Sequence, residues 1–313
     1  MKHDGKRLIV RDEYSMTSST LHAPAPGWLG QIRFVLVRTS HPGNVGAAAR
    51  AMQVMGLREL VLVAPRDRRI AQHPDAVARA SGALAALERA VVVDTLDEAL
   101  APCALTIAVS AETRAFGPLP QPPEEVAALA FSRAQADPRT RIAFVFGSER
   151  DGLSIEEAGR CQRMCTIPGE SSYSSLNLAQ AVQIVAYCLR THERLLAAAR
   201  RTADAFADVS ADASTDRSPG RSTCGSAAAS GGALTAGATA AVAEHAQIEA
   251  LYAHLERALI RIGFLDLRHP KKLMPRLRRL FARAELQPEE VALLRGVCTQ
   301  IEKACRYPYG QPD

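Results

Sequence analysis

The densest group of polar side chains lies in the segment 167–182, IPGESSYSSLNLAQAV, between an apolar run and a long amphipathic helical pattern. Ser174, Ser175 and Asn177 fall where this helix should begin. The first turn of a helix has unpaired N–H groups and the positive end of the helix dipole, which side-chain caps or a polar ligand can satisfy. A single serine there is most often a cap. Two serines and an asparagine exceed what one cap needs, so the segment is a candidate ligand site.

A second group of candidates follows the first apolar run, in the segment 38–56, RTSHPGNVGAAARAMQVMG. Asn44 is placed to cap a helix predicted over residues 45–56. That helix opens on small residues, and Arg50 is its only charged side chain. A surface arginine lying along the helix would explain Arg50. The small side chains at positions 46 and 47 instead favour space left for another backbone or a ligand.

These candidates need a scaffold, and the order of elements predicts one α/β domain. Short runs rich in branched residues predict strands, and helical stretches separate them. This alternation is typical of a parallel sheet covered by helices on both faces. The predicted strands are residues 32–37, 59–63, 90–93, 105–109, 142–146 and 164–167. The predicted helices are residues 45–56, 74–87, 124–134, one from 178 onward, and two short ones with capping boxes at Thr95 and Ser154.

Ligands of such sheets bind beyond the carboxyl ends of the strands. Three predicted strand ends carry small or polar residues: 109–111, 147–149 and 167–175. We expect these ends to converge on one pocket. The chain has no GxGxxG dinucleotide fingerprint, no phosphate-binding P-loop and no GxSxG elbow. The pocket would offer backbone amides, hydroxyls and one arginine without a nucleophile–base pair, which suits a cofactor that brings its own reactive group.

Composition narrows the class of protein without deciding it. The 313 residues are 47% hydrophobic, and the net charge of +5 permits a nucleic-acid partner without requiring one. Seven cysteines without a CxxC pair favour reduced packing thiols in the cytoplasm and indicate no metal site. No apolar run is long enough to cross a membrane. Residues 1–30 lack the apolar core of a signal peptide and are predicted to be a flexible tail.

The composition changes after residue 201. Residues 202–244 are rich in Ala, Ser and Gly and cannot bury enough surface to order themselves, so we predict a linker. Residues 245–313 show three amphipathic helical patterns, which predict a small bundle. The middle pattern is basic. A solvated face or a membrane surface would explain it, but a run of cations without an acid favours contacts with nucleic-acid phosphates. The cations are Lys271, Lys272, Arg276, Arg278, Arg279 and Arg283.

Three segments together carry a resemblance to a known family: HPGNVGAAARAM, FVFGSERDGLS and IPGESSYSSLNLAQAV. They resemble the signature motifs of the SPOUT methyltransferases. Within that superfamily they are similar to the enzymes that methylate the ribose 2′ oxygen of cytidine or uridine 32 in the tRNA anticodon loop. The resemblance covers residues 32–196 and extends to the C-terminal segment FLDLRHPKKLMPRLRRLFARAEL. It implies a methyltransferase domain over residues 31–201, S-adenosylmethionine as methyl donor, a trefoil knot and a homodimer.

The resemblance also implies roles for individual residues. Arg50 corresponds to the family's essential arginine, Asn44 to its first-motif asparagine, and Ser175 and Asn177 to the polar pair of its third motif. Because a guanidinium holds its proton strongly, we expect Arg50 to orient the ribose hydroxyl and an adjacent phosphate. The implied cofactor pocket consists of Val109, Ser110, Ala111, Gly147, Ile167, Ser174, Ser175 and Leu176.

Two alternatives to a methyltransferase stay open at this point. One is a non-catalytic RNA-binding or assembly protein on the same fold, against which the joint presence of Arg50, Asn44, Ser175 and Asn177 argues. The other is a nucleotide-dependent oxidoreductase, which the missing glycine fingerprint disfavours.

Overall fold

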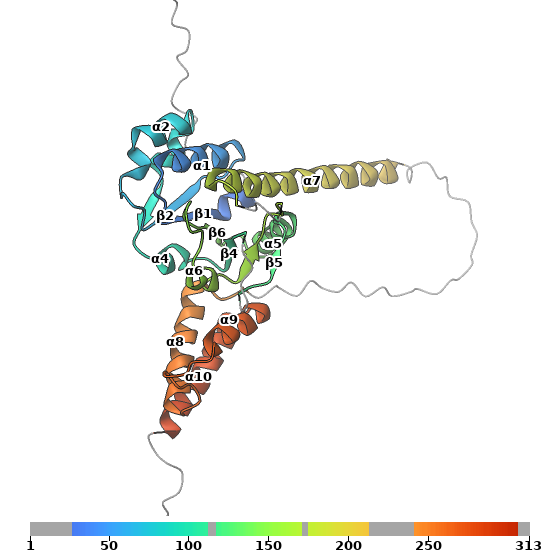
Figure 1. Cartoon of the computed structure of the whole chain (residues 1–313). Coiled ribbons are helices and arrows are strands. Elements are labelled where there is room, and N and C mark those ends of the chain that lie inside the picture. Colours follow the sequence, from blue (N-terminus) through green and yellow to red (C-terminus); the bar gives the residue numbers. More distant parts are fainter. Residues whose placement is uncertain (1–26, 112–116, 171–174, 213–240, 306–313) are drawn as a thin grey trace, which may run out of the picture.

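The computed structural model describes residues 27–111, 117–170, 175–212 and 241–305. Within these ranges the chain forms an α/β domain and a smaller helical lobe beside it (Figure 1). Most of the predicted tail, Ser174, the centre of the predicted linker and residues 306–313 lie outside the described residues.

The α/β domain is built on a seven-stranded sheet in the order β3-β2-β1-β6-β4-β7-β5. Every strand pair is parallel, as the alternation of strands and helices predicted. One strand forms where the sequence indicated only a proline-rich loop, and the last predicted strand ends two residues early. The strands are β1 Ile32–Val37, β2 Glu59–Val63, β3 Val91–Val93, β4 Leu105–Val109, β5 Pro120–Gln121, β6 Ile142–Phe146 and β7 Arg163–Cys165.

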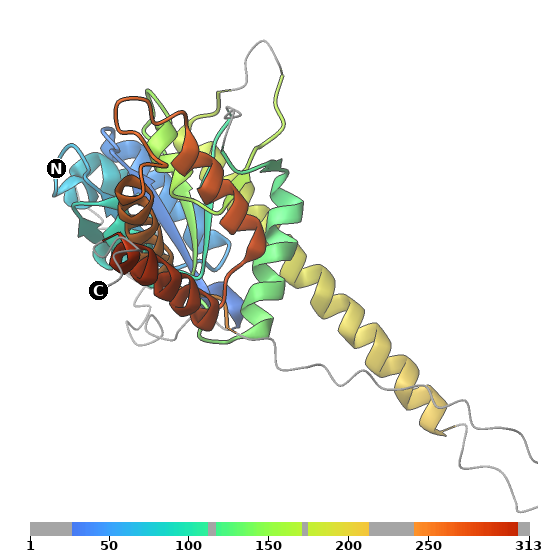
Figure 2. The ribbon, with the colours of Figure 1, turned by 90° about the horizontal axis from the view of Figure 1, so that it is seen from below.

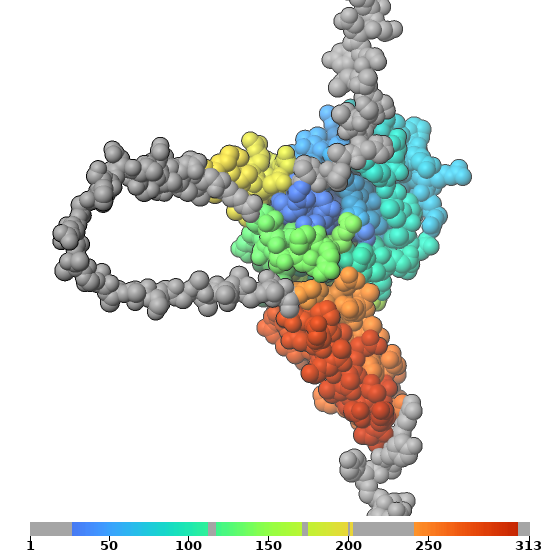
Figure 3. Space-filling view, turned by 180° about the vertical axis from the view of Figure 1, so that it is seen from behind, coloured from blue at the N-terminus to red at the C-terminus, as the bar shows by residue number. Residues whose placement is uncertain are grey.

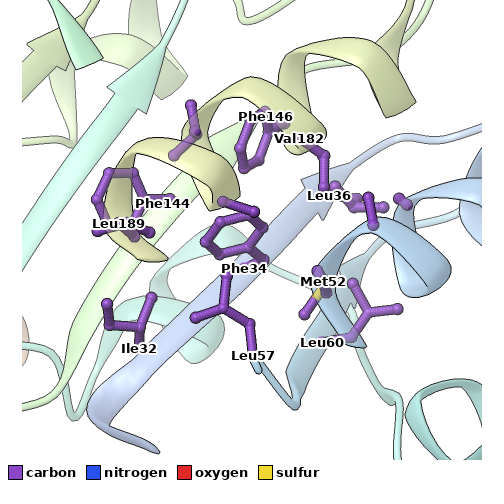
Figure 4. Packing of buried hydrophobic residues seen from close by; sticks show 14 of the residues in the cluster. Ile32, Phe34, Leu36, Met52, Leu57, Leu60, Phe144, Phe146, Val182 and Leu189 are labelled. Carbon is purple, nitrogen blue, oxygen red and sulfur yellow. The ribbon is translucent and has the colours of Figure 1, made fainter. Parts of the chain in front are cut away.

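Helices cover both faces of this sheet, as predicted (Figure 1). Neighbouring residues of a strand point to opposite faces, so β1 divides its apolar side chains between two cores. Phe34 packs with Phe144 and Phe146 under the helices of one face (Figure 4). Those helices are α1 Pro42–Val54, α5 Pro123–Ala136 and α7 Leu178–Asp212. Val35 and Val145 pack on the other face, against α4 Leu96–Leu100 and α6 Ile155–Gly159.

Helix α1 begins earlier than the sequence predicted. Its first residue is Pro42, and proline suits this position because the first N–H groups of a helix have no partner within it. Asn44 therefore lies inside the first turn, and the prediction that it caps the helix is wrong. The predicted helix 74–87 is in fact α2 Pro74–Ala80 and α3 Leu84–Glu88, interrupted where Ser81 adopts a φ of 53°.

Helix α7 continues to Asp212, past the predicted start of the linker at residue 202. The segment 202–212, TADAFADVSAD, contains four alanines, and alanine has the highest helix propensity. Extending an existing helix avoids the cost of nucleation, so this stretch needs no core of its own. Figure 1 shows α7 projecting away from the α/β domain.

The helical lobe contains α8 His245–Arg261, α9 Leu273–Ala284 and α10 Pro288–Ala304, close to the three predicted patterns. Its small core is formed by Ile248, Leu251, Tyr252, Leu286 and Val291. In Figure 3 the lobe projects from the α/β domain as a separate mass. Across the residues that the structure describes, no helix has the length and apolar character needed to cross a membrane.

Ion pairs fix the lobe against the face of the sheet that carries α4 and α6. Arg160 reaches Glu249 of α8 at 2.8 Å, and Arg163 reaches Glu285, just after α9, at 2.6 Å. The backbone N–H of His245 also donates to the carbonyl of Cys103 at 2.8 Å. The two bodies therefore contact each other directly, independently of the chain that joins them. The sheet order alone does not establish the trefoil knot, which stays a prediction.

Candidate active site

The ends of β4 and β6 and the chain after β7 meet around one pocket of about 300 Å³. The amide of Ser110 donates to the carbonyl of Cys165 at 3.0 Å and so holds two of these ends together. The structure thus brings together residues that are far apart in the sequence, as the strand ends predicted. Of the predicted cofactor residues, those that line the pocket are Val109, Ser110, Ala111, Gly147, Ile167, Ser175 and Leu176.

The backbone at Gly147 forms part of the pocket wall and leaves no room for a side chain. A Cβ atom at this position would lie less than 3.0 Å from backbone atoms of Gly152 and Leu153. The same turn is closed by two hydrogen bonds between Ser148 and Gly152, at 3.0 and 3.2 Å. The glycine is therefore required for the close approach of the two chain segments.

Gly147→Ala is expected to lower the free energy of unfolding by about 1–3 kcal/mol, because the turn at 148–152 must move to admit the methyl group. The measurement is thermal or urea unfolding. Gly82→Ala is the matched control, since a Cβ there meets no atom within 4 Å. Equal stability of the two variants would contradict the tight packing at Gly147.

Beside the pocket, side chains from three separate segments hydrogen-bond in a row. The Asn177 Nδ2 donates to Asn44 Oδ1 at 3.1 Å, and Asn44 Nδ2 donates to Glu149 Oε1 at 3.2 Å. Asn177 Oδ1 also accepts from the amide of Ala179 at 2.9 Å. Asn177 therefore caps α7 and contacts Asn44 at the same time, so the capping and site interpretations are compatible.

Glu149 is a residue of this cluster that the sequence analysis did not select. Its carboxylate accepts from the Ser40 amide at 3.1 Å and from the His41 amide at 3.2 Å, besides Asn44. Burial acts to raise the pKa of this carboxyl, but the hydrogen bonds outweigh burial and hold the pKa below its usual value. Glu149 thus fixes the loop before α1 to the end of β6. The available signal was a charged residue three positions after a buried strand, within the strand end 147–149 that was expected to reach the pocket.

The structure does not bring Arg50 to the pocket of its own chain. Arg50 is absent from the pocket lining, and its exposed side chain stands six residues after Asn44, a rise of about 9 Å along α1. The space that the sequence indicated at Gly46 is filled by the backbone of α2, since a Cβ there would lie less than 3.0 Å from Ala76.

The predicted RNA-contacting cations divide into two groups in the structure. Arg276, Arg279 and Arg283 follow one another at intervals of three and four residues, so they share one face of α9, and Lys271 and Lys272 precede that helix. Arg278 instead points toward α8. Its guanidinium donates to Glu249 at 2.7 Å and lies 4.3 Å from the centre of the Tyr252 ring. Arg278 therefore holds α9 in place and leaves the set of phosphate-contacting candidates.

Among the residues that the structure describes, neither a reactive cysteine nor a group of metal ligands is found at this site. Burial raises the pKa of the Cys103 and Cys165 thiols to about 12, so these side chains are not reactive thiolates. In the described ranges, no group of three or more His, Cys, Asp or Glu side chains could hold a metal ion.

Comparison with known proteins identifies the family of this chain. Residues 31–187 match the model of the SpoU rRNA Methylase family, and residues 246–309 match the model of the tRNA methyltransferase TrmJ C-terminal domain. The chain belongs to the SpoU methylase family. The two matched regions of this SpoU methylase correspond to the α/β domain and to the helical lobe.

Two similar proteins cover nearly nine tenths of the chain, and a third covers about half of it. The tRNA (cytidine/uridine/adenosine-2′-O-)-methyltransferase TrmJ of Pseudomonas aeruginosa is 42% identical over 281 residues, which cover 89% of this chain and 96% of the relative. The solved structure of TrmJ from Z. mobilis has a TM-score of 0.65 at 28% identity and covers 86% of this chain and 98% of that one. A probable methyltransferase from Bordetella pertussis is 48% identical, with a TM-score of 0.50, over 52% of this chain and 96% of that one.

Proposed function

We propose that this SpoU methylase transfers a methyl group from S-adenosylmethionine to a ribose 2′ oxygen of tRNA. The curated relatives are tRNA 2′-O-methyltransferases that match about nine tenths of the chain. The observation that carries the proposal is the meeting of three strand ends around one pocket, with the linked Asn44 and Asn177 beside it. The oxidoreductase alternative has no comparable support.

The pocket residues fit S-adenosylmethionine. A volume of about 300 Å³ lies in the range of small-molecule sites. Val109, Ile167 and Leu176 supply apolar surface, while the backbone around Ala111 and Gly147 offers amides and carbonyls without bulky side chains. The cofactor supplies, when bound, a methyl group on a sulfonium sulfur. The protein then has only to align an oxygen with that group.

Asn44, Asn177 and Ser175 supply polar groups for this alignment. The hydrogen bond between the two asparagines and the link from Asn44 to Glu149 hold the amides in fixed orientations. Such a pre-arranged polar edge can position a ribose hydroxyl without a conformational cost at each turnover. Arg50 would add paired hydrogen bonds to the hydroxyl and to an adjacent phosphate.

The position of Arg50 favours an active homodimer. Arg50 is displaced from Asn44 by six residues, about 9 Å along α1, and its exposed side chain does not line the pocket of its own chain. We therefore assign Arg50 to the pocket of a second copy of the chain, in a two-fold dimer in which each pocket combines both protomers. In this form the enzyme acts on tRNA in the cytoplasm.

The substrate nucleotide that we propose is cytidine or uridine 32. Three measurements test the function in order. Isothermal titration should show binding of S-adenosylhomocysteine and none of NAD. A methyl-transfer assay on total tRNA should then show incorporation, and its absence despite cofactor binding would favour the non-catalytic alternative. Mass mapping of ribose methylation in tRNA from cells lacking the protein should show a loss at position 32. A loss only at another nucleotide would contradict this assignment.

Replacing Arg276, Arg279 and Arg283 by glutamine is expected to weaken tRNA binding at least tenfold at low salt and leave cofactor binding unchanged. Each lost phosphate contact should lower the slope of log affinity against log salt by roughly 0.9, so the slope should fall by about 2–3. Filter binding at several salt concentrations measures both quantities.

The matched control replaces Arg58, Arg89 and Arg139 by glutamine. These arginines precede β2, β3 and β6, and so lie at the amino edge of the sheet, opposite the pocket. The control has the same net charge change. An equal fall in slope for both triple variants would indicate a general charge effect and would remove α9 from the proposed RNA contact.

A further inference from the structure

The loop between α8 and α9, residues 262–272, presents three large apolar side chains to solvent: Ile262, which is 47% exposed, and the more exposed pair Phe264 and Leu267. Phe264 and Leu267 are each 67% exposed, whereas Leu265 between them is 4% exposed. Single exposed apolar residues are common on protein surfaces. Several of them on one short loop, with Leu265 buried between the two most exposed, form an apolar patch of the kind that marks an interaction site.

Hydrogen bonds hold this loop in one conformation. The amides of Phe264 and Leu265 donate to the carbonyl of Leu259 at 3.0 and 3.1 Å. Asp266 then accepts from the Arg268 amide at 2.8 Å through its side chain, and from the His269 amide at 3.0 Å through its carbonyl. The exposure of Phe264 and Leu267 is therefore built into an ordered turn, and each side chain is already positioned for contact.

The charges of the loop indicate which kind of partner it binds. Arg268 and Lys271 are exposed cations that follow the apolar pair, and Lys272 continues the run to the start of α9. The one acid of the loop, Asp266, is used in the turn itself. A surface that combines an aromatic ring with cations matches unpaired nucleotides, whose bases have flat faces and whose phosphates are anionic. A base-paired duplex hides those faces and would contact only the cations.

The loop ends close to the proposed pocket. Lys272 and Met274 line a second cavity, of about 740 Å³, together with Pro118 and Ile155 of the α/β domain. Ile155 lies two residues after Leu153, which lines the first pocket. The start of α9 therefore lies toward the edge of the sheet where the strand ends form that pocket. Figure 2 shows α9 lying alongside the sheet.

We infer that the α8–α9 loop is a stacking platform for unpaired nucleotides of the RNA substrate. Phe264 stacks on a base, Leu267 extends the apolar surface, and Arg268 and Lys271 pair with the flanking phosphates. The inference rests on the proposed function, and it adds which part of the tRNA is recognised: its single-stranded loop in place of its paired stem.

The test compares two RNAs of equal length and charge, an anticodon stem-loop and a continuous duplex, by fluorescence titration with the full-length protein and no cofactor. Phe264→Ala should weaken binding of the stem-loop on the order of tenfold and leave the duplex affinity unchanged. Phe264→Trp should retain the stem-loop affinity, because a larger ring can still stack. Leu293→Ala, at a position that is 66% exposed on α10, is the matched control and should change neither affinity.

Arg268→Ala should weaken both RNAs and lower the salt slope by about one, which separates phosphate pairing from stacking. Unchanged stem-loop affinity in Phe264→Ala, or an equal loss for the duplex, would overturn the inference. So would a Phe264-dependent change in sedimentation or in binding to phosphatidylserine vesicles without an effect on RNA, since it would show a protein or lipid contact. These experiments measure RNA binding alone. A negative result for the loop can therefore be distinguished from a failure of the wild-type enzyme to transfer a methyl group, which would contradict the proposed function.

Discussion

Arg50→Lys is expected to slow single-turnover methyl transfer by about 100-fold or more and to leave S-adenosylhomocysteine affinity unchanged. Lysine keeps the positive charge but loses the planar pair of donors that can hold a hydroxyl and a phosphate together. Loss of alignment alone can cost on the order of 100-fold in rate. Cofactor affinity should persist because Arg50 is assigned to the ribose hydroxyl and the phosphate, and the residues that line the cofactor pocket are unchanged. Near wild-type turnover would remove Arg50 from the chemistry.

A mixing experiment decides which chain supplies the arginine. Asn44→Ala and Arg50→Lys should each be inactive as homodimers. If Arg50 acts across a two-fold interface, a mixed dimer has one complete pocket, and a randomised equal mixture should recover about a quarter of wild-type activity. The Arg50→Lys protomer contributes Asn44 to that pocket, and its partner contributes Arg50. A mixture that stays inactive would contradict the shared site.

Glu149→Gln is the second substitution with a large expected effect. At pH 7 we expect the free energy of unfolding to fall by about 1–2 kcal/mol, a modest value because the carboxylate is only partly buried. We also expect methyl transfer to slow on the order of 100-fold, because a neutral amide cannot accept from Ser40, His41 and Asn44 together and the Asn44 side chain loses its orientation.

The pKa shift of Glu149 also determines in which direction the free energy of unfolding changes with pH. The folded-state pKa of Glu149 lies below its unfolded-state value, so its stabilising effect is complete above the unfolded-state pKa of roughly 4.3. It is lost as the pH falls through the lower folded-state pKa. The difference in unfolding free energy between wild type and Glu149→Gln should therefore be full at pH 7 and shrink below about pH 4. Glu88→Gln, at an exposed position, is the control. A difference that does not change with pH would rule out the charged hydrogen bonds.

The sequence was sufficient wherever one local property decides the structure. Apolar runs such as 32–37 and 142–146 predict buried strands because burial dominates their energy. The capping box of Ser154 and Glu157 formed as predicted, since its two hydrogen bonds involve residues only three positions apart. The convergence of strand ends followed from the rule for parallel sheets.

The sequence was insufficient where two distant segments share one side chain. Asn44 is of a residue type that often caps helices. Only its contacts with Glu149 and Asn177 show that its side-chain amide hydrogen-bonds to other segments and not to the helix end. Arg278 was indistinguishable from the other cations of its run until Glu249 and Tyr252 were placed next to it. The family resemblance supplied Arg50, but the residue pattern contains no information on which chain's pocket it serves.

The contacts of Arg160 and Arg163 with the helical lobe have a consequence for substrate choice. They join the α/β domain and the helical lobe directly, so they hold the distance between the methyl-transfer pocket and the cations of α9 constant. An RNA fills both places at once only if its target ribose and its bound phosphates are the same span apart. Selection would then depend on the shape of the folded RNA, and bases outside the two contact points could vary freely.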